Sequence, residues 1–255
     1  MATTQDFVIQ QGKTFSQVLR WETAPIIYKA ITGIAQTAPV SITAAGHGVP
    51  PNWRVAVVSV NGMTQINSPL DSKSRPTVYH QATVVDPNTI SLNDTNAAGF
   101  SAWTSGGYVQ YNTPTNLTGF TARMTIKDRI TAPNLLVCTT GGTTGLTLPT
   151  AAGADGTAVW GAAPAGSVRS ITWTPSTVVA LGAVIDTHEL LRLDTTNARI
   201  AIDTVNYTIT LTIAATDTAA IPWLQGVYDL EMVSAGGVVT ALLSGNISVS
   251  QEVTT

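Results

Sequence analysis

Three histidines offer the widest range of chemistry in this chain, because an imidazole acts as base, acid or metal ligand near neutral pH. His47 stands between glycines in Gly46-His47-Gly48, and His80 and His188 lie far from it in the sequence. No cysteine or carboxylate stands at metal-ligand spacing from any of them. For His47 we favour a turn residue whose ring packs on its own domain over a metal ligand or a base.

Carboxylates are the second candidate for catalysis, since a glycoside hydrolase needs a pair of them in a cleft. The candidates are Asp186, Glu189, Asp194 and Asp203. An ordinary β-protein offers as many, so they carry little weight. The serine motif G-x-S-x-G is absent, and Gly141–Gly145 lacks the Gly-Lys-Ser/Thr of a phosphate loop. The sequence therefore predicts no enzyme and no cofactor.

Metal and disulfide chemistry find equally little support. The oxygen-rich run 93–96 lacks the spacing and distal glutamate of an EF-hand loop. The chain has one cysteine, Cys138, which excludes an internal disulfide and a multi-cysteine zinc site. Its apolar neighbours suggest a buried small side chain. We expect no metal site.

Composition limits the partners. The net charge of −3 gives no electrostatic case for nucleic acid or an anionic membrane. Charged residues make up only 11% of the chain, against roughly 25% in ordinary domains. Such a surface suits an assembly subunit, because contacts with neighbours cover much of it. The N-terminus MATTQDFVIQ lacks a signal peptide, and no apolar run approaches ~20 residues, so we expect assembly in a cytoplasm.

Strict alternation of apolar and polar residues marks several half-buried strands. The clearest segments are 120–127, 207–213 and 226–233, and 238–243 returns as the second arm of a hairpin. A single helical turn is expected at 216–221, capped by Thr216-Asp217. No segment sustains a period of 3.6 residues, so the chain is predicted to be all-β.

Residues 35–111 form an internal cassette of short apolar runs that end at turn signals. The signals are Gly46-His47-Gly48, Asn61-Gly62, Asp86-Pro87-Asn88 and Gly106-Gly107. This pattern is typical of a compact barrel or sandwich. Trp53, Trp103 and Tyr79 lie within it and either stack on sugar rings or fill its small core. We favour the core, because a module this small needs large side chains.

Several short sequence motifs resemble those of known protein families. Those of the cassette are Ala45-Gly46-His47-Gly48, Val60-Asn61-Gly62-Met63, Ile66-Asn67, Thr89-Ile90-Ser91-Leu92 and Thr104–Tyr108. They resemble the module that phage proteins share with the first catalytic-cysteine half-domain (FCCH) of ubiquitin-activating enzymes. The flanking words QGKTF, LTG-TARM-I, TITLTIAATDTAAI and YDLE-V resemble a β-sandwich of tailed-phage structural proteins. No ubiquitin chemistry follows, since Cys138 lies outside the cassette.

The resemblance implies a discontinuous architecture. Residues 1–34 and 112–255 would form an Ig-like β-sandwich, and 35–111 an inserted barrel-like module. Ala30–Ile34 and Tyr108–Tyr111 would pair as the neck of the insertion.

A second insertion is expected at 140–186, which is rich in Gly, Ala and Thr. We consider two structures for it: an arm that lies on a neighbouring subunit, or an extra pair of strands on the sandwich edge. In the arm, the interface side chains would be Trp160, Trp173, Leu181 and Val184.

The function implied is that of a structural subunit in a tailed-phage virion, in the tail, neck or baseplate. It would oligomerise and anchor fibres or neighbouring rings. Its partners would be copies of itself and other tail, neck or fibre proteins, with no nucleic acid and no membrane. The alternatives are a capsid decoration protein and a receptor-binding module that contacts a host-surface glycan.

Overall fold

Strands dominate the computed structural model, which describes residues 3–172 and 178–252. They account for 49% of the chain and helices for 3%, so the all-β prediction is confirmed. The chain divides into two compact units. Unit 1 holds Met1–Leu19, Thr118–Ile202 and Ile209–Thr255, and unit 2 holds Arg20–Leu117 with Asp203–Thr208.

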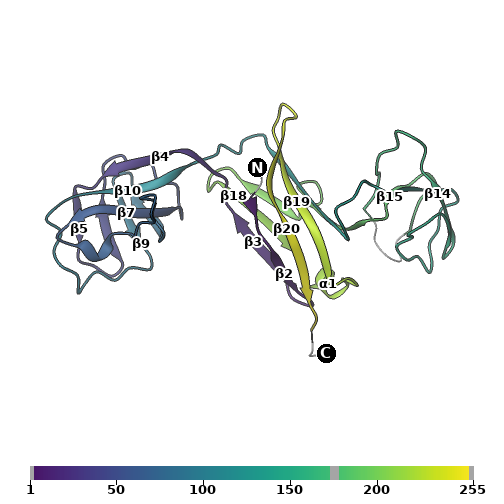
Figure 1. Cartoon of the computed structure of the whole chain (residues 1–255), viewed down its shortest axis with the longest axis horizontal. Helices are drawn as coiled ribbons and strands as arrows, with labels where there is room; N and C mark the ends of the chain where they lie inside the picture. Colours follow the sequence, from purple (N-terminus) through teal and green to yellow (C-terminus); the bar gives the residue numbers. More distant parts are fainter. Residues whose placement is uncertain (1–2, 173–177, 253–255) are drawn as a thin grey trace. The chain divides into compact units, whose positions relative to one another are not determined.

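A six-stranded sheet of unit 1, called sheet A, takes strands from both ends of the chain. The C-terminal strand β20 pairs with antiparallel β19 and, in parallel, with the N-terminal strands β1 and β2 (Figure 1). β19 then pairs with β11, and β11 with β16. The bounds are β1 (Thr3–Thr4), β2 (Phe7–Gln10), β11 (Thr121–Lys127), β16 (Glu189–Asp194), β19 (Gln225–Val233) and β20 (Val239–Ser250).

A three-stranded sheet, called sheet B, packs on sheet A. Its order is β17 (Ile200–Asp203), β18 (Thr208–Ile213) and β3 (Phe15–Leu19). Phe7 of β2 meets Phe15 of β3 with ring centroids 5.8 Å apart and stacks on Tyr228 of β19 at 5.1 Å. These aromatic contacts join the two sheets through one core.

The predicted alternation is present in three of these strands. Burial alternates residue by residue along β11, β18 and β19. The buried side chains are Ala122, Met124, Ile126, Ile209, Leu211, Ile213, Tyr228, Leu230 and Met232. Because successive side chains of a strand point to opposite faces, this pattern places the charged residues of β11 and β19 on the outer face of sheet A.

The short helix α1 (Ala215–Ala219) begins differently from the prediction. Its N-cap is Ala214, with no side-chain cap, instead of the predicted Thr216-Asp217. Thr218 is buried, and its hydroxyl donates to the carbonyl oxygens of Lys13 and Ala215. A contact with the N-terminal segment therefore holds the turn where a capping side chain was expected.

Unit 2 is built on a seven-stranded sheet around one apolar core. The order is β4 (Glu22–Ala30), β10 (Ser105–Pro114), β7 (Arg54–Asn61), β8 (His80–Asp86), β9 (Thr89–Leu92), β6 (Val40–Thr43) and β5 (Gly33–Ala35). A 3-10 turn, η1 (Thr64–Ile66), follows β7. Trp53, Met63 and Tyr111 are among the buried side chains of the core. Tyr207, from residues 203–208, packs edge-on against Trp53 at 6.2 Å.

The bounds of unit 2 are wider than the predicted cassette, 35–111. β4 pairs with β10 from Ala30 opposite Tyr108 to Glu22 opposite Pro114, with a shift in register between Asn112 and Thr113. The pairing thus begins before the predicted neck. Gly106 and Gly107 form no turn but lie inside β10, with φ of 68° and 98°. Glycine tolerates these angles, so the strand continues through them.

The segment predicted to be an arm folds as a small module, called the 135–186 module. Its order is β13 (Gly153–Asp155), β14 (Ala158–Ala162), β12 (Leu135–Cys138) and β15 (Val184–Asp186). In the described part of the chain, these strands pair with one another and with neither sheet of the sandwich. The core contains Leu136, Cys138, Leu146, Ala158, Trp160, Val179, Ala183 and Ile185. Because these side chains bury one another, neither the projecting arm nor the extra edge strands describe this segment.

Candidate functional site

His47 is a structural turn residue. Its side chain is buried, Nδ1 accepts from the N–H of Val49 at 3.0 Å, and Nε2 lies 2.9 Å from the carbonyl oxygen of Asp86. A backbone N–H only donates and a carbonyl only accepts, so the proton sits on Nε2. The Tyr111 hydroxyl donates to the His47 carbonyl at 2.5 Å, and burial raises the pKa of that phenol. Both ring nitrogens are occupied, which leaves no lone pair for a metal.

The other two histidines each pair with one carboxylate. Nδ1 of His80 lies 2.9 Å from Asp94, and Nδ1 of His188 lies 3.0 Å from Asp128. Within residues 3–172 and 178–252, no three His, Cys, Asp or Glu side chains gather closely enough to hold a metal ion.

The candidate catalytic carboxylates make structural contacts. Asp186 is 4% exposed and accepts from Lys127 Nζ at 2.8 Å and from the N–H groups of Asn134 and His188, each at 3.1 Å. Asp203 accepts from Asn206 and the N–H of Val205 within a turn.

Glu189 is buried as well. Its carboxylate meets the Arg169 guanidinium at 3.0 Å. Burial raises the pKa of Glu189, against the opposing charge of Arg169. The contacts of Asp186 and Glu189 connect the 135–186 module to β11 and β16.

Asp194 predicts a pH dependence of stability. Burial works to raise its pKa, but hydrogen bonds from Thr196, Arg192 and the N–H of Asn197 outweigh it and lower the pKa from 3.8 to about 2. Because the pKa is lower in the folded than in the unfolded state, the ionised carboxylate stabilises the fold above pH ~4. This stabilisation is lost as the pH falls towards ~2, and it amounts to at most about 2 kcal/mol of unfolding free energy. We expect Asp194→Asn to flatten this loss in urea unfolding at pH 6, 4 and 2.5. A profile for Asp194→Asn that runs parallel to the wild-type profile would contradict the assignment.

The predicted interface residues of the former arm separate in the structure. Trp160 is 1% exposed within the module core, and Val184 is buried, so neither is available to a neighbour as predicted. Leu181 is 72% exposed at a tight turn, where the N–H of Ala183 bonds to the carbonyl of Ala180. Gly182 follows it with φ of 83°, as the third residue of such a turn requires. Trp173 lies outside the described residues.

The cassette aromatics are mostly core residues, as favoured from the sequence. Trp53 is fully buried, and Trp103 packs against the same core while its Nε1 donates to the carbonyl of Gly106 at 3.0 Å. Tyr79 is half-buried beneath the Arg54 guanidinium, 4.7 Å from its ring centroid.

Sequence reasoning missed an apolar patch on unit 2, called the tyrosine patch: Ile26, Tyr28 and Tyr108. Ile26 is 41%, Tyr28 54% and Tyr108 45% exposed, and the tyrosine rings meet edge-on at 6.3 Å. The residues sit on adjacent strands, β4 and β10. The available signal was the alternation of Ile26 and Tyr28 just before the predicted neck, which itself contains Tyr108.

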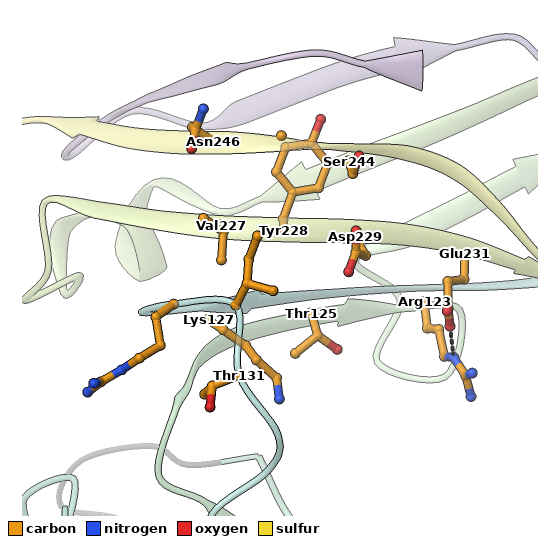
Figure 2. Close-up of a pocket in the computed structure, with 13 residues that line it drawn as sticks. Arg123, Thr125, Lys127, Thr131, Val227, Tyr228, Asp229, Glu231, Ser244 and Asn246 are labelled. Carbon is orange, nitrogen blue, oxygen red and sulfur yellow. Dashed lines mark hydrogen bonds and ion pairs between the residues drawn. The ribbon is translucent and has the colours of Figure 1, made fainter. Parts of the chain in front are cut away.

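A polar groove on the outer face of sheet A is the second missed feature (Figure 2). It has a volume of about 510 Å³. Its lining comes from β11, β19, β20 and the loop after β11: Arg123, Thr125, Lys127, Arg129, Ile130, Thr131, Val227, Tyr228, Asp229, Glu231, Ser244, Gly245 and Asn246. The sequence signal for this groove was the row of polar residues that the alternating strands place on the outer face of the sheet.

The chain matches no family model and no curated protein sequence. No helix in the described ranges has the length and apolarity needed to cross a membrane. The tyrosine patch and the groove are the exposed features from which a function can be proposed.

Proposed function

We propose that this protein is a structural subunit of a tailed-bacteriophage particle, in the tail, neck or baseplate. It would be assembled in the host cytoplasm, oligomerise, and anchor fibres or neighbouring rings. The resemblance of the cassette and sandwich words suggests the particle. Its mechanism is association, and the exposed tyrosine patch is the observation that carries it.

The patch has the composition of an interface. Tyrosine is enriched at interface centres, because it buries a large apolar area and loses little conformational entropy on binding. Within the described chain, β4 ends the strand order of its sheet, so one of its sides is open. Pro25 and Lys29 lie on this edge strand and disfavour pairing with another strand. Side chains, rather than backbone hydrogen bonds, would make the contact.

A second copy of the chain is the occupant we propose for the patch. Ile26, Tyr28 and Tyr108 are uncharged, so a self-contact there carries no like-charge repulsion. Closed homo-oligomers are the commonest assemblies of soluble proteins. The low charged fraction of 11% fits a surface that neighbours cover.

The test is self-association of a Tyr28→Ser, Tyr108→Ser double variant, measured by sedimentation velocity. We expect wild type to be oligomeric and the variant to associate at least ~10-fold more weakly, about 1.4 kcal/mol. Because both side chains are exposed, Tm should stay within about 3 °C.

Val85→Ser is the matched control, since Val85 is a comparably exposed apolar residue of β8. It should associate as wild type does. A monomeric wild type, or equal weakening by Val85→Ser, would contradict association through the patch. Negative-stain images separate the alternatives: rings support a tail, neck or baseplate subunit, whereas monomers that bind only capsids support a decoration protein.

A further inference from the structure

The polar groove is built from cross-strand rows. Thr125 of β11 stands opposite Asp229 of β19, and Asp229 stands opposite Ser244 of β20. A carboxylate therefore lies between two hydroxyl-bearing residues on the outer face of the sheet, as Figure 2 shows. On the next row, Arg123 stands opposite Glu231.

Ion pairs already neutralise the cations of the groove. Arg123 meets Glu231 at 2.7 Å, Lys127 meets Asp186 at 2.8 Å, and Arg129 meets its neighbour Asp128 at 3.1 Å. These pairs still have unused donors and acceptors, because a guanidinium carries five N–H groups and an ammonium three. Among the described residues, no hydrogen bond or ion pair engages the carboxylate of Asp229. The groove thus offers many hydrogen bonds without an excess of positive charge.

The loop that walls the groove is anchored at both ends. At its start, the N–H of Asp128 bonds to the carbonyl of His188 at 3.0 Å, and the Asp128 carboxylate meets Nδ1 of the same histidine. At its end, Asn134 accepts from the N–H of Thr187 at 3.0 Å. Between them, Ile130 is 91% exposed and lines the groove. An exposed apolar side chain thus lies beside the polar floor.

We propose that this groove binds a neutral oligosaccharide. Sugar hydroxyls donate and accept together, so they match paired guanidinium and carboxylate groups set side by side. The apolar C–H faces of a pyranose would contact Ile130 and Val227. The volume of about 510 Å³ falls within the ~300–1,000 Å³ of small-molecule sites.

Other ligand classes fit less well. A phosphate or nucleic acid would find every cation of the lining already paired, with Asp229 and Glu231 repelling it. An apolar ligand would contact Ile130 and Val227, but Tyr228 is buried, and the ligand would also have to desolvate Asp229 and the ion pair of Arg123 with Glu231. This binding is independent of self-association through the tyrosine patch, so either result leaves the other standing.

The probes are maltotriose, cellotriose and triacetylchitotriose, with trigalacturonate as the anionic comparison. We expect at least one neutral probe to bind the full chain with a Kd of about 1 mM or tighter by calorimetry. Amide NMR shifts should concentrate on β11, β19 and the 129–131 loop.

Two variants locate the binding. Asp229→Asn should weaken the affinity about 10-fold and Thr125→Val about 3-fold, because they remove a charged and a neutral hydrogen-bond partner. Thr212→Val is the control, since Thr212 is a similarly half-exposed strand threonine in sheet B. It should bind as wild type does, and all three should keep the wild-type Tm.

Three results would overturn the proposal. The first is no neutral probe binding below about 20 mM. The second is binding of trigalacturonate alone, which would indicate an anion site. The third is neutral binding that neither groove variant changes, which would place the sugar elsewhere on the chain.

Discussion

Replacing Trp160 with alanine is expected to cost about 3–5 kcal/mol of stability, because the indole is a large buried side chain of the 135–186 module. The other core residues are mostly small or aliphatic, so little nearby volume is available to fill the cavity. The loss should be local to the module. Hydrogen exchange of the β12 and β14 amides is the measurement.

The adjacent residue supplies the control. Val159 lies in the same strand and is 40% exposed, so Val159→Ala should leave exchange in β12 nearly unchanged. The β19 and β20 amides of sheet A should stay protected in Trp160→Ala. Equal loss of protection in both regions would mean that module and sandwich unfold as one unit. Unchanged exchange would mean that the indole is not a core residue.

Local alternation made the sandwich strands readable from sequence. In β11, β18 and β19, one face is buried and one is wet, and the period of two follows from strand geometry alone. The role of His47 in a turn could be predicted for a similar reason, because the signal consists of three consecutive residues, His47 and the glycines on either side of it. These features need no knowledge of distant residues.

The 135–186 module was not readable in this way. β13 and β15 have three residues each, too few for a period to show. Its core joins Leu136 to Val179 and Ile185, which are distant in sequence. Trp160 therefore suggested an exposed arm, because it is a large apolar residue in a Gly-rich segment. In the structure it is buried by core residues that come both before and after it in the sequence.

Strand register limited the site prediction as well. The groove depends on Thr125, Asp229 and Ser244 coming into line across three strands. A shift of one residue in either pairing would turn the side chains of a strand to the core, and the sequence does not state the register. The tyrosine patch likewise needs Tyr28 and Tyr108 on neighbouring strands, 80 positions apart.

Replacing Asp186 with alanine is the other large effect expected. The carboxylate is the partner of Lys127, whose side chain is only 23% exposed, and of two backbone N–H groups. Removing one member of a buried ion pair costs about 3–5 kcal/mol, because the remaining charge stays desolvated. The partial exposure of Lys127 places the expected loss near the lower end of that range. Chemical denaturation followed by circular dichroism measures it.

Asp217→Ala is the matched control, since Asp217 pairs with Arg199 at 2.9 Å but its side chain is 42% exposed. An exposed pair contributes about 1 kcal/mol or less, so this variant should remain close to wild type. The comparison also tests the role of Asp186 as one of the four carboxylates considered for catalysis. A catalytic group is commonly removed with little loss of stability, whereas a carboxylate that anchors β15 to β11 is not. If Asp186→Ala unfolds no more readily than Asp217→Ala, the contacts of Asp186 with Lys127, Asn134 and His188 do not stabilise the module. Asp186 would then again be a candidate catalytic carboxylate.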